Sequence, residues 1–344
     1  MIIGNPPYLE ARQINYSVGD KYKTLDSGAV HAYCIERSNI ILRGNMSMIV
    51  PIALTSTQRM VTVQNILEQN HSLWYSNFAW RPAKLFDQVN RALSIFIANK
   101  VTSKKQNFTT EYIKWQSDNR IQLMYLLKYT EYSEKRNSFW MPKLRVSIEN
   151  SILKKILDQK YSLNNYVHKN GSGRLYYRTT GGLYWKVFTD FSPKFLCNGV
   201  KGKSSRETSI NLINTNVSKA LVAFFTSDVF WWWYTVTSNL RDLNPSDLYG
   251  ILIPTTLIEN IELKQKGEKL LSDLENNSTM LTREQKGKGT TQTQSFKIAK
   301  SKPIIDEIDK VLAKHYGFTE EELDFIINYD IKYRMGDELE SNED

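Results

Sequence analysis

Three short apolar runs near the start of the chain, separated by a helical pattern, constrain the fold more than any other feature. The runs cover residues 1–3, 46–50 and 93–98, and each has the length and composition of a buried strand. Between the first two, residues 29–44 carry apolar side chains at helical spacing, and Gly44 is expected to supply a left-handed cap. This alternation of strand, helix and strand predicts an α/β sheet.

The first predicted strand is too short to begin a doubly wound sheet that folds by itself. We therefore expect an incomplete Rossmann-like sheet, with further strands supplied from before Met1. An α+β domain and C-terminal helices are expected to follow it.

The middle of the chain is rich in Tyr, Trp and Phe. Short strand-like pieces at 174–180 and 183–189 predict a separate α+β domain. Trp231, Trp232 and Trp233 are consecutive, and neither a helix nor a strand can direct all three indoles to one surface. We therefore expect at least two of them in the core.

The last part of the chain reads as helices joined by a linker. Residues 259–285 are helix-compatible and polar, and the low-complexity run 286–295 indicates a linker. Pro303 and Gly317 fit the start and end of a helix, and Thr319 with Glu322 forms a capping-box pattern that opens a second one. The predicted segments are 1–136 (half of an α/β domain), 137–258 (second domain), 259–302 (polar helix and linker), 303–335 (helical hairpin) and 336–344 (acidic, disordered tail).

The motif that carries chemistry is Asn5-Pro6-Pro7-Tyr8, at the carboxyl end of the first strand, where open α/β sheets bind ligands. The prolines fix the backbone, so the Asn5 side chain and the Pro6 carbonyl present two converging acceptors. Such acceptors can hold both hydrogens of an aromatic amino group and free its lone pair for attack, while Tyr8 stacks on the ring. The alternative is a proline turn in which Tyr8 only packs.

The context of this motif resembles a known family. "IIGNPPY", "HAYCIERSNIILRGNMSMIVPIALTST" and "KLFDQVNRALSIFIANK" together resemble the second half of the catalytic domain of gamma-class DNA adenine-N(6) methyltransferases, in particular the type IIG restriction-modification methylases. "FFTSDVFWWWYTVTSNLRDLNPSDLYGILIP" and "KPIIDEIDKVLAKHYGFTEEELDFIINYDIKYRMG" resemble their target-recognition region and C-terminal helices. The resemblance implies site-specific methyl transfer from S-adenosylmethionine to a flipped adenine in double-stranded DNA.

By this resemblance Asn5, Pro6 and Pro7 form the turn that binds the adenine amino group, and Tyr8 stacks on the base. A second aromatic side chain is expected on the other face of the base. The candidates are Phe78, Phe86 and Phe96, of which Phe96 lies in an apolar strand where core burial is an equal alternative.

The resemblance also leaves parts of the family unmatched. Its members carry a Phe-x-Gly-x-Gly loop and a ribose-binding acid well before Asn-Pro-Pro-Tyr, and nothing comparable occurs in these 344 residues. We therefore expect most of the S-adenosylmethionine site, and a nuclease domain, to lie upstream of Met1. A split subunit with a separate donor-binding chain, a truncated product and an incomplete gene model remain alternatives, and we expect little activity from this chain alone.

Cations for DNA phosphates are expected in several loops and strands, with an ordinary solvated surface as the alternative for each. The DNA-binding candidates are Arg81, Lys84, Arg174, Arg178, Lys194, Lys201, Lys203, Arg206, Arg241 and Asn244. The excess of Lys and Arg over Asp and Glu, 45 to 36, fits a polyanionic partner.

Other classes of site are disfavoured. Cys34, Cys197 and the four histidines have no metal-ligand or disulfide spacing, so no metal is expected. The sequence has neither a long apolar run nor a signal peptide, so we expect a cytoplasmic protein. Two other functions remain open: a non-catalytic DNA-binding specificity module, and a protein glutamine methyltransferase, since those enzymes also use Asn-Pro-Pro-Tyr.

Overall fold

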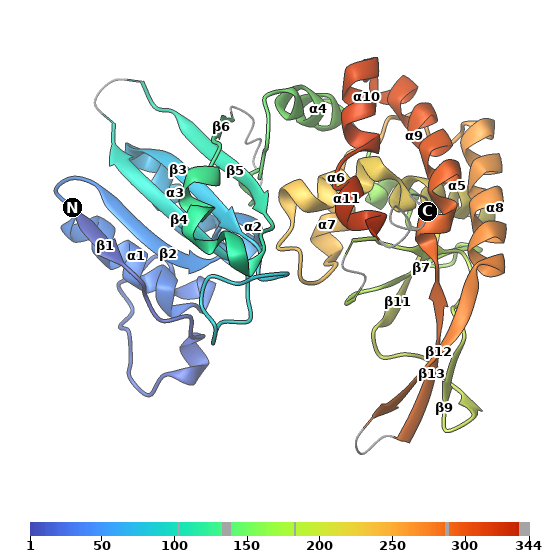
Figure 1. The fold of residues 1–344 in the computed structure, drawn as a ribbon, viewed down its shortest axis with the longest axis horizontal. Coiled ribbons are helices and arrows are strands. Elements are labelled where there is room, and N and C mark those ends of the chain that lie inside the picture. The colour runs from blue at the N-terminus through green and yellow to red at the C-terminus, as the bar shows by residue number, and fades with distance from the viewer. Residues whose placement is uncertain (102–103, 133–138, 182–183, 286–288, 337–344) are drawn as a thin grey trace. The chain divides into compact units, whose positions relative to one another are not determined.

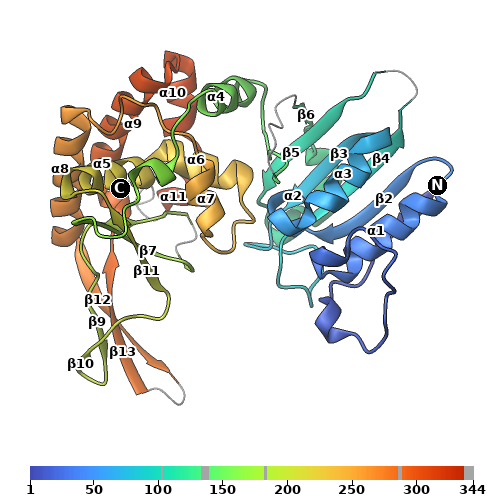
Figure 2. The same ribbon diagram turned by 180° about the vertical axis from the view of Figure 1, so that it is seen from behind.

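The computed structural model describes residues 1–101, 104–132, 139–181, 184–285 and 289–336 (Figures 1 and 2). The chain divides into two compact units, Met1–Ser151 with Thr235–Asn239, and Ile152–Tyr234 with Leu240–Asp344. Two helices, α4 (Ile148–Leu157) and α6 (Asp228–Thr237), contribute residues to both units. The predicted tail after residue 336 lies outside the described residues.

Unit 1 is built on a six-stranded mixed sheet. Its strands lie in the order β1-β2-β4-β3-β5-β6, with β1 parallel to β2, β3 parallel to β5 and the other pairs antiparallel. The strands are β1 (Ile2–Gly4), β2 (Met46–Pro51), β3 (His71–Phe78), β4 (Leu93–Lys100), β5 (Asn107–Ile113) and β6 (Thr130–Glu131). The helices are α1 (Val30–Ile41), α2 (Ala53–Ser56) and α3 (Val61–Asn70), with 3-10 turns η1 (Ala11–Gln13), η2 (Leu25–Ser27), η3 (Gln58–Met60) and η4 (Ser117–Leu126).

The three strands and the helix predicted at the start of the chain are confirmed. Met46, Met48 and Val50 alternate into the core along β2, and α1 and α3 lie together on one face of the sheet (Figure 2). The predicted cap at Gly44 is wrong: α1 ends at Ile41, the next residue Leu42 has an extended backbone, and Gly44 is not left-handed.

Unit 2 combines two small antiparallel sheets with a group of helices, which confirms the mixed α/β fold with an α+β second part. One sheet has the order β11-β7-β8 and the other β10-β9-β13-β12. The strands are β7 (Gly173–Arg178), β8 (Phe188–Thr189), β9 (Phe195–Cys197), β10 (Val200–Lys201), β11 (Glu207–Leu212), β12 (Ser278–Gln285) and β13 (Gly289–Phe296). The helices are α5 (Thr215–Thr226), α7 (Pro245–Gly250), α8 (Ile261–Asn276), α9 (Lys302–Tyr316), α10 (Glu320–Ile327) and α11 (Ile331–Arg334), with turns η5 (Leu163–Tyr166) and η6 (Ile298–Ser301).

Helix α6 is apolar around its whole circumference, and such a helix is stable only when it is buried on all sides. Trp231, Trp232 and Trp233 are each at most 3% exposed, so all three indoles belong to the core. The sequence expected this of at least two.

The predicted strand at 174–180 is confirmed by β7. Of the strand predicted at 183–189, only the last two residues form a strand, β8. Leu183 lies outside the described residues.

The interpretation of residues 286–295 as a linker is wrong for the part that the structure describes. Strand β13 pairs along its whole length with β12, so the polar helix ends at Asn276 and a β-hairpin follows. The polar residues of β13 are largely Thr and Gln, which alternate from Thr291 to Gln294, and β-branched threonine favours strands. Low sequence complexity therefore concealed a period-two pattern.

The C-terminal helices form as predicted. Gly317 is left-handed at the end of α9, and the Thr319 side chain accepts a hydrogen bond from the Glu322 amide while the Glu322 side chain accepts one from Thr319. Within the described residues, no helix is both long enough and apolar enough to cross a lipid bilayer.

A close approach of α5 and α8 yields the first testable prediction. Gly267, in α8, touches the backbone of α5, and a Cβ at this position would overlap the Lys219 carbonyl. In a helix interior, alanine is normally more stabilising than glycine by about 1 kcal/mol. An overpacked side chain, however, costs about 1–3 kcal/mol. We expect Gly267→Ala to lower the free energy of unfolding, measured by urea denaturation.

The matched control is Gly44→Ala. A Cβ at Gly44 meets no atom within 4 Å, so this variant should change the free energy of unfolding by less than about 0.5 kcal/mol. A Gly267→Ala protein more stable than wild type would contradict the close packing of α5 on α8.

Candidate active-site turn and nucleic-acid groove

The Asn-Pro-Pro-Tyr turn begins directly after β1, at the carboxyl end of this strand, where Gly4 pairs with Met48 of the longer parallel strand β2. Asn5 and Pro7 are exposed, Pro6 is buried and Tyr8 is half-buried. Within the described residues the Asn5 side chain has no hydrogen-bond partner, so its amide oxygen is available as an acceptor.

Tyr8 is held through both its side chain and its backbone. Its hydroxyl donates to the Ile49 carbonyl of β2 at 3.4 Å, and Arg91 Nη1 donates to the Tyr8 carbonyl at 3.3 Å. Burial raises the pKa of Tyr8 to about 12, although the Arg91 charge opposes the shift. The phenol is therefore neutral at physiological pH, which suits a stacking side chain and excludes a general base.

A clamp fixes the chain immediately after the turn. Arg59 Nη1 and Nη2 donate to the two carboxylate oxygens of Glu10 at 2.5 and 2.9 Å, and Nη1 also donates to the Ser27 carbonyl at 3.1 Å. Bidentate pairing of this kind restricts orientation as well as distance. The Val30 amide donates to the Leu9 carbonyl at 3.0 Å, which ties the same segment to the start of α1.

His31 is buried beside this clamp. Among the described residues neither of its ring nitrogens has a hydrogen-bond partner, and its side chain is only 3% exposed. Burial, followed by the positive charge of Arg59, lowers the pKa of His31 to about 4, with Glu10 opposing and Arg91 adding to the shift. The imidazole is therefore neutral at physiological pH.

Two of the three candidates for the second stacking aromatic are not suited to that role. Phe78, at the end of β3, and Phe96, inside β4, are completely buried, so neither has a free face for a base. Phe86 is 38% exposed and lies on the loop between β3 and β4. The apolar strand around Phe96 gave a signal of core burial, whereas Phe78 at a strand end did not.

Arg81 and Lys84 lie on the same loop as Phe86. The Arg81 guanidinium lies 4.3 Å from the centroid of the neighbouring Trp80 ring, and Lys84 Nζ donates to Asn90 Oδ1 at 2.7 Å. The loop ends at Arg91, the residue that contacts the Tyr8 carbonyl. The structure thus places the Asn-Pro-Pro-Tyr turn beside the segment that carries these candidates.

Unit 2 contains a groove of about 920 Å³ between its two sheets. One side is a single face of the four-stranded sheet, because the strand pairing sets Arg283 beside Thr291 and Leu281 beside Thr293, and Thr293 beside Phe195. Tyr176 and Arg178 of β7 line it as well, together with Tyr184 and Trp185.

Four exposed cations line this groove, from strands and loops far apart in the sequence. They are Arg178, Lys203, Arg206 and Arg283. Desolvation, followed by the charges of Arg206 and Arg283, lowers the pKa of Arg178. Mutual repulsion of this kind is relieved by a polyanion, and aromatic side chains beside the cations add stacking surfaces for bases.

A fifth cation, Lys186, lines the groove but is directed into the protein. Its Nζ donates to the Gly181 carbonyl at 3.1 Å and lies 4.7 Å from the Tyr234 ring centroid. Burial lowers its pKa to about 8, although Asp247 and Asp242 oppose the shift.

The remaining sequence candidates lie outside the groove lining. Lys194 and Lys201 are exposed near β9 and β10, and Arg241 is exposed with an ion pair to Asp242 at 3.8 Å. Arg174 and Asn244 have structural contacts: the Arg174 guanidinium donates to the Gly171 and Gly173 carbonyls at 2.6 and 2.8 Å, and Asn244 caps α7.

Sequence reasoning missed Arg283 and the aromatic pair Tyr184 and Trp185. Arg283 lay in a segment interpreted as helix. Met280 and Leu281 are adjacent in β12, so no alternation of apolar and polar residues marked this segment as a strand.

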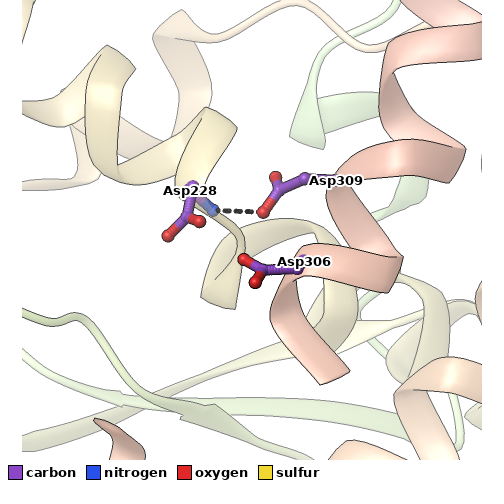
Figure 3. Close-up of side chains that lie close together, drawn as sticks. All are labelled: Asp228, Asp306 and Asp309. Carbon is purple, nitrogen blue, oxygen red and sulfur yellow. Dashed lines mark hydrogen bonds between the residues drawn. The ribbon is translucent and has the colours of Figure 1, made fainter. Parts of the chain in front are cut away.

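Three buried or half-buried aspartates, Asp228, Asp306 and Asp309, lie close together at the start of α6 and on α9 (Figure 3). Two cations already pair with members of this group: Asp228 with Arg334 and, at 3.0 Å, with Lys302, which also pairs with Asp306. The Asp309 carboxylate accepts the Asp228 and Val229 amides at 3.2 and 3.1 Å, so it caps α6. This cluster is a structural ion network.

Comparison with known proteins supports the fold. No protein-family model and no curated protein matches the chain. The structure is similar to that of the type IIL restriction-modification enzyme MmeI in complex with DNA, with a TM-score of 0.52 and 9% identity, over 94% of this chain and 55% of MmeI. At this identity the likeness concerns the fold alone.

Two other likenesses are too weak to support an argument. The DrdV–DNA complex has a TM-score of 0.36 and 8% identity, over 79% of this chain and 44% of that chain. The ATP-dependent type ISP restriction-modification enzyme LlaBIII bound to DNA has a TM-score of 0.40 and 10% identity, over 98% of this chain and 36% of LlaBIII. This chain therefore spans about half the length of MmeI and less of the other two.

The buried His31 yields a prediction about pH. The unfolded chain titrates this group near its ordinary value of 6.5 and the folded chain near 4, so the unfolded state binds more protons between these values. The contribution of His31 to stability is therefore complete above pH 6.5 and falls by about 3 kcal/mol as the pH drops towards 4.

We expect His31→Leu to remove this part of the pH dependence, measured by denaturant unfolding at several pH values. The exposed His168 provides the control, since His168→Leu should keep the wild-type dependence. An unchanged slope in His31→Leu would show that His31 is not buried in its neutral form.

Proposed function

We propose that this chain forms the amino-group-binding turn and the DNA-recognition part of a DNA adenine-N6 methyltransferase in a restriction-modification system. The observation that carries the proposal is the exposed Asn5 at the carboxyl end of β1, whose side chain has no hydrogen-bond partner in the part of the chain that the structure describes. A neutral Tyr8 follows it, held in place by Ile49 and Arg91. The DNA-bound state of MmeI, which has a similar fold, supports DNA as the partner.

In this proposal the turn binds an adenine that has left the duplex. The Asn5 amide oxygen and the Pro6 carbonyl accept the two amino hydrogens, which localises the nitrogen lone pair for attack on a methyl group. Tyr8 stacks on one face of the base, and Phe86 is the candidate for the other face because it is the exposed one of the three phenylalanines.

S-adenosylmethionine is the donor that the resemblance implies, but the described residues do not form a site that fits it. Among the residues that the structure describes, no glycine-rich loop follows a strand and opens a helix. Strand β1 lies at the edge of its sheet, and Ile3 on it is 72% exposed. We propose that a segment outside these 344 residues, in a partner chain or a longer protein, pairs with this edge and carries the donor site.

The groove of unit 2 is proposed as the DNA-binding surface, with its cations on phosphates and its aromatic side chains on bases or sugars. Because unit 2 alone builds this groove, the second candidate function, a DNA-binding specificity module without catalysis, remains consistent with it. Methyl transfer distinguishes the two.

The groove assignment predicts salt-dependent DNA binding. We expect Arg206→Gln and Arg283→Gln each to weaken double-stranded DNA binding and to reduce the slope of log affinity against log salt by about 1. Fluorescence anisotropy at several salt concentrations measures both quantities.

Lys300→Gln is the matched control, because Lys300 is an exposed cation of unit 2 outside the groove lining. Equal losses for all three variants would show that only net charge matters, and a wild-type chain that binds no DNA at low salt would refute the groove.

The turn assignment predicts that Asn5→Ala abolishes methylation in a complex reconstituted with a donor-binding segment. Losing one of the two acceptors should lower the rate at least about 100-fold, while DNA affinity stays unchanged because Asn5 is not part of the groove. Transfer of a radiolabelled methyl group to DNA measures the activity.

Asn15→Ala, at an exposed asparagine outside the turn, should retain activity. Full activity in Asn5→Ala would disprove the role of the turn. Transfer to a protein amide in place of adenine would favour a glutamine methyltransferase.

A further inference from the structure

We propose that Arg334, near the C-terminus, is a positioning residue that holds the aromatic wall of the groove in its DNA-binding arrangement. The wall consists of Tyr184 and Trp185, which line the groove and precede β8 in a segment without regular secondary structure. The inference rests on the proposed DNA-binding function of the groove.

Helix α11 contacts this wall at four points, although the two segments are about 150 residues apart. The Arg334 guanidinium carbon lies 3.7 Å from the Trp185 ring centroid. Arg334 Nε donates to the Tyr184 carbonyl at 3.3 Å, and Trp185 Nε1 donates to the Arg334 carbonyl at 3.1 Å. The rings of Tyr333 and Tyr184 stack with centroids 5.9 Å apart.

Arg334 can hold this segment because its own side chain is anchored. It is 1% exposed and pairs with Asp228, which is fully buried at the start of α6. Its guanidinium carbon also lies 5.5 Å from the ring centroid of Trp231, inside the same helix. A buried ion pair with one partner removed leaves an uncompensated charge, so the pair resists rearrangement.

The arrangement affects DNA binding because ordering a loop on binding costs free energy and so lowers the affinity. Tyr184 and Trp185 lack strand pairing of their own, and Arg334 supplies their order in advance. Removal of Arg334 should therefore weaken DNA binding without changing any cation of the groove.

The direct test is Arg334→Met, with DNA affinity measured by fluorescence anisotropy and stability by thermal unfolding of the full chain. We expect affinity to fall about tenfold, a part of the stacking contribution of an aromatic side chain. Arg334→Lys keeps the charge beside Asp228 but loses the planar guanidinium on Trp185, and should recover stability more than affinity.

Lys302→Met is the matched control. Lys302 pairs with the same Asp228 at 3.0 Å, but its described contacts do not include Tyr184 or Trp185. It should lower the melting temperature while DNA affinity stays within about twofold. Lys332→Met, at an exposed cation of α11, controls for the loss of one positive charge.

A double-mutant cycle separates positioning from general stability. If Arg334 acts through Trp185, then Arg334→Met and Trp185→Phe should have non-additive effects on DNA affinity. Additive effects, or equal losses of affinity in Arg334→Met and Lys302→Met, would overturn the proposal.

Should Arg334→Met fail to fold, Arg334→Lys decides the question, since it keeps a cation beside Asp228 and removes the guanidinium from Trp185. Full DNA affinity in that variant would overturn the proposal. A wild-type chain that binds no DNA would instead refute the proposed function, and these two outcomes are distinguishable.

Discussion

The organisation of the second unit depends on the carboxylate of Asp228. This side chain is fully buried at the start of α6 and pairs with Lys302 of α9 and Arg334 of α11. The backbone amide of Asp228 donates to the Asp309 carboxylate of α9. The start of α6 is therefore linked to both α9 and α11. Charges buried this deeply are tolerated only when each has a partner, and removing one partner costs several kcal/mol. The network therefore fixes which C-terminal helices lie beside the apolar α6.

That network also has a consequence for the surface of the unit. Through Arg334 it reaches Tyr184 and Trp185, which line the groove between the two sheets. The cations of this groove come from β7, β12 and the residues before β11. They repel one another, so binding of an anionic ligand would relieve the repulsion. A rigid aromatic wall beside that charge is suited to a polyanion with flat bases, and this combination underlies the proposed DNA contact.

The Asn-Pro-Pro-Tyr turn in the first unit is held in place differently, by prolines and by contacts with distant residues. Its prolines restrict the backbone before folding, and the bidentate pair of Glu10 with Arg59 fixes the chain that follows. Arg91, at the end of the loop that carries Phe86, contacts the Tyr8 carbonyl. Proline stiffness and contacts over 49 and 83 residues thus combine to hold the turn that carries the exposed Asn5.

The sequence by itself determined the elements whose pattern is local: the early strands, helix α1, the capping box at Thr319 and the burial of at least two of the three consecutive tryptophans. It also predicted a binding role for Asn5 and Tyr8, because prolines restrict the backbone of neighbouring residues, and this role stays a prediction. Tertiary structure alone decided that 278–296 forms a hairpin, that Phe78 is buried and that Arg283 faces Arg178 across a groove. These outcomes depend on strand register and on pairing between distant segments, and neither is encoded in the local spacing of residue types.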